Sequence, residues 1–143
     1  MANYVITGAA KGIGLELCKQ LSSKPESEVS QIFAITRSEP SQALHDLIQS
    51  SSGRVTHILA SVTDLESIKC AADEVKSHVG ARGVDCLVNN AALGGVSPRG
   101  SLVEMEEEQM ERLFDTNVVG PHRMIVAFLP LLRQGKQRKV INM

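Results

Sequence analysis

Five short apolar runs recur along this chain, and helix-forming stretches lie between them. The runs are rich in β-branched residues and nearly free of polar interruptions, which is typical of strands that are covered on both faces. They lie at Tyr4–Thr7, Gln31–Thr36, Thr56–Ala60, Cys86–Asn89 and Val140–Met143. Repeated alternation of strand and helix predicts an α/β fold with one parallel sheet and right-handed crossovers.

Two of the intervening stretches have the periodicity of an amphipathic helix. The first has apolar residues at every fourth position, at Ile13, Leu17 and Leu21. The second begins at Thr63 or Asp64, either of which can serve as N-cap, and Glu66 completes a capping-box pattern with Thr63. Its apolar positions are Leu65, Ile68, Ala72, Val75 and Val79.

A third helical region extends from about Glu104 to Arg133. We expect an interruption near Gly120-Pro121, because proline lacks a backbone donor, and an end at Gly135. The Pro121–Arg133 part is apolar on more than one face, so it needs cover from the sheet and from a second surface. We therefore expect a homodimer or larger homo-oligomer that buries this helix.

Length and composition restrict the class of protein. With 143 residues, the chain corresponds to a single domain, residues 1–143. A net charge of −1 predicts neither nucleic-acid binding nor attraction to an anionic membrane. No apolar run approaches the roughly 20 residues of a membrane span, and a strand at Tyr4 leaves no room for a secretory leader.

The cysteines favour a reducing compartment. Cys18, Cys70 and Cys86 have no CxxC spacing, so we expect small buried hydrophobic residues, with no disulfide and no metal site. A cytoplasmic location is the corresponding expectation.

A glycine-rich turn stands between the first strand and the first helix. Gly8, Gly12 and Gly14 follow the spacing GxxxGxG, directly after the strand that ends at Thr7. Glycines allow a pyrophosphate to approach backbone N–H groups, and the start of the following helix supplies partial positive charge. This arrangement predicts a dinucleotide-binding site.

The end of the second strand bears on the choice of dinucleotide. An acidic residue there would bind the 2′-hydroxyl of the adenosine ribose, but Arg37 stands at that place, with Ser38 beside it. An arginine suits a 2′-phosphate, and Lys11 in the glycine turn adds a second cation. The sequence therefore favours NADP(H) over NAD(H).

Three ordered motifs resemble those of the short-chain dehydrogenase/reductases, and of the small NADPH-dependent carbonyl reductases in particular. They are TGAAKGIG at Thr7–Gly14, NNAA at Asn89–Ala92 and TNVVGP at Thr116–Pro121. The resemblance covers the whole chain and implies a Rossmann-like doubly wound parallel sheet of order 3-2-1-4-5. In such a sheet the chain would be truncated after the fifth strand, which forms an edge.

The resemblance also implies residue roles. Residues of the first motif would hold the pyrophosphate, and residues of the second would border the cofactor ribose. Asn117 would hold a water molecule in a proton relay and is the candidate catalytic residue. The implied cofactor-binding set is Thr7, Gly8, Lys11, Gly12, Ile13, Gly14, Arg37, Ser38, Ser61, Val62, Asn89, Asn90 and Ala91.

Some positions depart from the family pattern. Ser61 stands where an aspartate usually lies near the adenine, and Ala92 replaces a glycine. The serine and the Tyr-x-x-x-Lys of family catalysis are missing, since the sole tyrosine, Tyr4, is followed four residues later by Gly8. Asn117 cannot replace them, because a neutral amide does not titrate.

Two hypotheses follow. In the first, the chain is the cofactor-binding portion of an NADP(H)-dependent oxidoreductase that acts on a carbonyl or alcohol. In the second, it is a naturally truncated, non-redox cofactor-binding protein, a pseudoenzyme or an isomerase-type catalyst that uses the same cleft.

Overall fold

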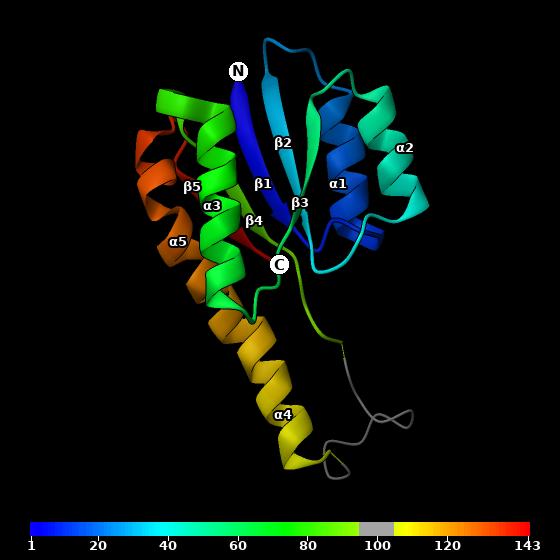
Figure 1. Cartoon of the computed structure of the whole chain (residues 1–143), viewed down its shortest axis with the longest axis vertical. Coiled ribbons are helices and arrows are strands. Elements are labelled where there is room, and N and C mark those ends of the chain that lie inside the picture. The colour runs from blue at the N-terminus through cyan, green and yellow to red at the C-terminus, as the bar shows by residue number, and fades with distance from the viewer. Residues whose placement is uncertain (95–104) are drawn as a thin grey trace.

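The computed structural model describes residues 1–94 and 105–143 of the chain. Their helices and strands alternate as the sequence predicts (Figure 1). The strands are β1 (Ala2–Thr7), β2 (Val29–Thr36), β3 (Val55–Leu59), β4 (Cys86–Asn89) and β5 (Lys139–Asn142). The α-helices are α1 (Gly12–Ser22), α2 (Gln42–Ser50), α3 (Leu65–Val79), α4 (Glu107–Phe114) and α5 (Gly120–Gln134). A 3₁₀ turn, η1 (Gly80–Arg82), follows α3, and a π-helical turn, η3 (Asp115–Val119), joins α4 to α5.

The strands form one parallel sheet in the order β3-β2-β1-β4-β5, which confirms the predicted fold class. Helices α1 and α2 cover one face of the sheet, and α3 and α5 cover the other (Figure 1). Each face has its own apolar core. Phe33 and Phe128 are buried on the α3–α5 side, and Ile32 and Leu44 are buried on the α1–α2 side.

The buried face of α1 differs from the prediction. Gly14, Leu15 and Cys18 are its buried residues, whereas Ile13 is 61% exposed. The helix packs closely on the sheet through small side chains, and Ile13 lies in its first turn, beyond the sheet's cover. Leu17 and Leu21 are partly buried against the core on this side of the sheet, as the repeat predicts, so the prediction was wrong at Ile13 and missed Gly14, Leu15 and Cys18.

The α3 stripe is buried as predicted except at its first position, where Leu65 is 43% exposed. Asp64 is the N-cap, and its carboxylate accepts hydrogen bonds from the backbone N–H groups of Glu66 and Ser67. The hydroxyl of Thr63 instead hydrogen-bonds that of Ser61, 2.8 Å away, so the capping box with Thr63 does not form.

The third helical region is interrupted close to the predicted place, since η3 ends at Val119 and α5 begins at Gly120. Its expected start, at about Glu104, lies outside the described residues. The backbone stays helical through η3 into α5, and Pro121 is the second residue of α5. Gly135 caps α5 as predicted.

Two of the three cysteines are buried, but Cys70 is exposed on α3, so the expectation of a buried residue was wrong there. All three are free thiols. In the portions of the chain that the structure describes, no helix combines the length and hydropathy that crossing a bilayer requires.

A buried carboxylate joins the centre of the sheet to its edge. Asp85, just before β4, accepts hydrogen bonds from the backbone N–H groups of Asn3, Lys136 and Gln137 at 2.8, 2.9 and 3.2 Å. It is 4% exposed. One side chain thus fixes the start of β1 and the turn that leads into β5.

Candidate active site

The glycine turn between β1 and α1 has a conformation that requires glycine. Gly8 and Gly12 have φ angles of +69° and +57°, in the left-handed region. A Cβ on Gly8 would lie 2.8 Å from the Cα of Ala91, and one on Gly14 would lie 2.5 Å from the carbonyl oxygen of Gly8. A Cβ on Gly12 would meet nothing within 4 Å. Gly8 and Gly14 therefore allow close packing, and Gly12 leaves the approach to α1 open.

The start of α1 is open for another reason. Among the described residues, no side chain caps α1, whereas Ser41 caps α2 and Asp64 caps α3. The first amide bonded within the helix is that of Leu15, which donates to the carbonyl of Lys11. The preceding amides of the first turn lack a helical acceptor, and they carry the positive end of the helix dipole.

The loop after β4 is fastened to the end of β1. The Thr7 hydroxyl accepts hydrogen bonds from the backbone N–H groups of Asn90 and Ala91, at 3.0 and 2.9 Å. The Asn90 side-chain amide donates to the carbonyls of Thr7 and Gly8, at 2.9 and 3.3 Å. Thr7 and Asn90 therefore hold the glycine turn and this loop together.

A cleft of about 970 Å³ lies at the carboxyl end of the sheet. It is lined by the glycine turn, by the loops after β2, β3 and β4, and by one side of α4 and η3. Parallel α/β sheets bind their ligands in this place, because the loops after adjacent strands converge there. The volume is at the upper end of the range for small-molecule sites.

Most of the predicted cofactor residues meet in this cleft. Those that line it are Thr7, Gly8, Lys11, Gly12, Ile13, Arg37, Ser38, Ser61, Val62, Asn90 and Ala91. Gly14 lies beneath the turn, against Gly8. Asn89 does not line the cleft, and its side-chain amide donates to Asn142 of β5 at 2.8 Å. Residue Asn89 thus joins the last two strands.

Asn117 also lies away from the cleft lining. Its side chain is in η3, where its Oδ1 accepts from the backbone N–H of Leu93 at 2.8 Å and its Nδ2 donates to the Leu93 carbonyl at 3.0 Å. Both amide atoms bind one backbone unit of the loop after β4. In this geometry Asn117 fixes that loop, and its predicted part in a proton relay stays a prediction.

Two cations and a carboxylate line the cleft where β2 ends. Lys11, Arg37 and Glu39 are all exposed there. Within residues 1–94 and 105–143, the ion pairs are Lys69–Glu66 and Arg123–Asp115, so none of the three is paired. Glu39 was not among the predicted site residues, because an acid that binds the ribose hydroxyl is expected directly at the end of the strand and Glu39 lies three residues beyond Thr36. Glu39 opposes a 2′-phosphate, whereas Lys11 and Arg37 attract one.

The turn that carries Arg37 is held by a short network. The Thr36 hydroxyl donates to the carbonyl of Ser38 and lies 2.7 Å from Nε2 of His57, on β3. Ser41 donates to the carbonyl of Ala10, which ties the loop after β2 to the glycine turn. No local pattern indicates the Thr36–His57 and Ser41–Ala10 contacts, since they join residues 21 and 31 positions apart.

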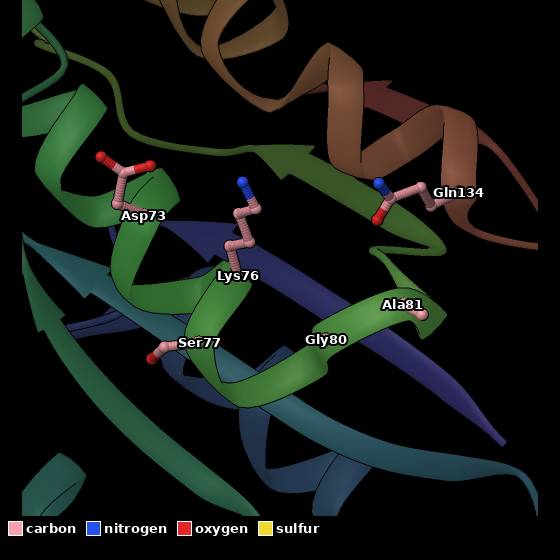
Figure 2. Close-up of a pocket in the computed structure, with 6 residues that line it drawn as sticks. All are labelled: Asp73, Lys76, Ser77, Gly80, Ala81 and Gln134. Carbon is pink, nitrogen blue, oxygen red and sulfur yellow. The ribbon is translucent and has the colours of Figure 1, made fainter.

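A second hollow, of about 510 Å³, lies near the other end of the sheet, where α3 and α5 finish. Figure 2 shows Lys76 of α3 and Gln134 of α5 on its two sides. None of the predicted site residues lines it.

The residues of the cleft suit a dinucleotide. The turn at Gly12 and the open amides of α1 can receive phosphate oxygens, and the cations at the end of β2 can receive a further anion. Val62 and the loop after β4 also line the cleft, and they offer apolar and backbone contacts to flat rings.

The family model described as short chain dehydrogenase matches residues 2–143. The short-chain dehydrogenase/reductase iacC of Pestalotiopsis fici is 38% identical over 150 residues, which cover 99% of this chain and 54% of that protein. The chain spans about half the length of the curated relatives it matches first.

Two solved structures are similar to the fold described above. The carbonyl reductase Sniffer of D. melanogaster has a TM-score of 0.87 at 25% identity, over 100% of this chain and 61% of that one. An NADPH-bound carbonyl reductase from chicken fatty liver has a TM-score of 0.81 at 28% identity, over 94% of this chain and 52% of that one.

Proposed function

Because this chain belongs to the short-chain dehydrogenase family, we propose that residues 1–143 are the cofactor-binding portion of an NADP(H)-dependent oxidoreductase. Its substrate class is a carbonyl compound or the corresponding alcohol. The observation that carries this proposal is the uncapped start of α1 behind Gly12, which faces a cleft large enough for a dinucleotide.

The pyrophosphate is assigned to the glycine turn. Its oxygens would accept hydrogen bonds from the free amides of the first turn of α1, and the open space beside Gly12 would admit them. The Thr7–Asn90 hydrogen bonds hold this turn against the loop after β4, so the cradle is formed before the ligand arrives. Preorganisation of this kind lowers the entropic cost of binding, because the loops need not be ordered when the ligand binds.

The preference for NADP(H) is assigned to Lys11 and Arg37. Both are exposed in the cleft and unpaired within the described residues, so a 2′-phosphate can approach them without breaking an ion pair. An arginine–phosphate contact is charge-assisted and is stronger than a neutral hydrogen bond. The chicken-liver carbonyl reductase, whose structure contains NADPH, supports the same choice. The carboxylate of Glu39 repels a 2′-phosphate, but two positive charges against one negative charge leave a net attraction.

The chemistry divides between cofactor and protein. A bound nicotinamide supplies or accepts the hydride. The chain's own residues bind and orient the cofactor, and Asn117 holds the loop at Leu93 that borders the cleft.

A proton must also reach the substrate oxygen as hydride is transferred. Tyr4 does not line the cleft, and burial is the main cause that raises its pKa, so it is unsuited to this role. We assign the proton donor to a part of the protein outside residues 1–143.

Binding calorimetry tests the cofactor assignment. We expect the protein to bind NADPH about tenfold more tightly than NADH, which corresponds to about 1.4 kcal/mol. The double variant K11A/R37A should bind NADPH and NADH equally, with the affinity that the wild type has for NADH. Absence of heat with either nucleotide, from folded protein, would refute the assignment.

Turnover distinguishes an oxidoreductase from a non-redox binding protein. Protein from its natural source should oxidise NADPH when a panel of ketones and aldehydes is added, measured by loss of nicotinamide absorbance. Its intact mass should exceed 15.4 kDa if the proton donor lies beyond these residues. Tight NADPH binding by such material without any turnover would favour the non-redox alternative.

We also propose that the protein assembles with a second copy through α5. Val126 and Leu129 of α5 are 54% and 38% exposed, and Met110 and Phe114 of α4 are 51% and 59% exposed. Exposed apolar side chains of this size are stabilised when a partner covers them. Light scattering after size-exclusion chromatography should give a dimer or larger oligomer, and V126E/L129E should give the monomer. A monomeric wild-type protein would refute the proposal.

A further inference from the structure

We propose that His57 and Thr36 are positioning residues that set the preference for the 2′-phosphate. The inference rests on the proposed NADP(H) binding and goes beyond it, because it assigns the preference to residues that need not touch the phosphate. Thr36 ends β2 and is 3% exposed, while His57 is half-buried in the neighbouring strand β3.

The direction of the hydrogen bonds follows from the atoms present. The Ser38 carbonyl oxygen carries no hydrogen, so the Thr36 hydroxyl must donate its proton to it. The hydroxyl then has only lone pairs to offer to His57, 2.7 Å away. His57 therefore donates from Nε2–H, and the chain of bonds runs from His57 to Thr36 to Ser38.

Arg37 lies in the turn that this network holds. The bond from Thr36 to the Ser38 carbonyl closes a tight turn, and Arg37 stands between its two ends. The Arg37 side chain is exposed and has no hydrogen bond or ion pair within residues 1–94 and 105–143. The position of this side chain therefore depends on the backbone of the turn, which the bond from Thr36 to Ser38 holds in place. His57 does not line the cleft, so it acts on Arg37 through Thr36.

The second cation is tied to the same loop. Ser41, at the end of the loop after β2, donates to the carbonyl of Ala10, next to Lys11. The turns that carry Lys11 and Arg37 are thus joined, and a displaced β2 loop changes the spacing between the two cations. A 2′-phosphate depends on that spacing, whereas the 5′-phosphate lies at the glycine turn.

Calorimetry with adenosine 2′,5′-bisphosphate and with AMP tests the inference without any turnover. The two probes differ only in the 2′-phosphate, so the ratio of their dissociation constants measures the preference. We expect H57L to lower the wild-type preference about tenfold, as for loss of one charge-assisted hydrogen bond, with AMP affinity unchanged within about twofold. H57Q retains an N–H donor and should keep the preference.

Further variants separate positioning from general loss of structure. T36V should resemble H57L, and T36S should resemble the wild type. T56V is the matched control, because Thr56 is the half-buried neighbour of His57 on β3 and its side chain has no hydrogen bond within the described residues. In an R37A background, H57L should cause no further change, since His57 acts through Arg37.

The outcomes are distinct. A wild-type preference that persists in folded H57L and T36V overturns this inference and leaves the proposed NADP(H) binding intact. Equal binding of the two probes by the wild type overturns both. If H57L does not fold, the comparison of T36V with T36S decides: equal preferences in these two overturn the inference.

Discussion

Replacing Gly12 with alanine should separate ligand binding from folding. Gly12 has a φ angle of +57°, so alanine there costs about 1–2 kcal/mol of stability. For a domain of this size, that cost lowers Tm by roughly 2–8 °C. The new methyl group meets no protein atom within 4 Å, and it stands instead in the open space beside the amides of α1. We expect the affinity for NADPH to fall about 100-fold, since charge-assisted hydrogen bonds of about 1.5–3 kcal/mol are blocked.

Gly14→Ala is the matched comparison, two residues along the same helix. Its Cβ would lie 2.5 Å from the Gly8 carbonyl oxygen and 2.6 Å from Nδ2 of Asn90, and the carbonyl belongs to backbone that cannot move aside cheaply. Overpacking of this kind costs about 1–3 kcal/mol or more, in addition to any effect on binding. Thermal unfolding and calorimetry together check the pair. If G12A binds NADPH like the wild type, or loses more stability than G14A, the argument from the open side of Gly12 is refuted.

Three further predictions concern charge and burial. D85N should lose about 2–4 kcal/mol in urea unfolding, because an amide presents N–H to at least one of the three backbone donors that the carboxylate accepts; wild-type stability in D85N would contradict this role. E39Q should raise the preference for NADPH over NADH about two- to fivefold in calorimetry, as for a screened charge, and a lowered preference would show that Glu39 serves the cofactor. Burial raises the pKa of the Cys18 thiol to about 12, from a usual value of 9.0; the folded state therefore binds this proton more tightly, and its contribution to stability is present below pH 9 and is lost as pH rises toward 12. Unfolding midpoints measured from pH 8 to 11 should decline less in C18A, and an equal decline would exclude Cys18 as the cause.

The strands and the glycine turn could be predicted because their signals are local. Continuous apolar runs mark strands that are covered on both faces, and Gly8, Gly12 and Gly14 stand where a strand gives way to a helix. β4 has the predicted bounds, β1 and β2 begin two residues earlier than predicted, and β3 and β5 are each shifted by one residue at both ends. The α1 face was predicted only in part: Leu17 and Leu21 do pack against the core, but Gly14 and Cys18 were missed because small residues add little to an apolar pattern.

The network around Arg37 could not be predicted in the same way. Thr36 meets His57, and Ser41 meets Ala10, only after β2 has paired with β3 and the chain has returned past α1. A single hydroxyl or imidazole in a sequence has many possible partners, and only the register of the sheet selects one. The sequence predicts the cation at Arg37, but it does not predict the hydrogen bonds that hold the turn carrying it.

Asn117 illustrates a further limit. Its motif was recognised, yet the structure shows both amide atoms bound to the backbone of Leu93. A motif identifies a position that the fold uses, and the hydrogen bonds show what that position does in this conformation.

The central place of β1 in the sheet bears on how the chain is synthesised and folded. β1 pairs with β2 on one side, but its other partner, β4, begins at Cys86, and Asp85 binds Asn3 at the same junction. A nascent chain therefore has its first strand translated early but left half-paired until residues 86–88 have emerged from the ribosome. Such non-local closure slows folding, and during that interval an apolar strand edge is available to chaperones or to aggregation.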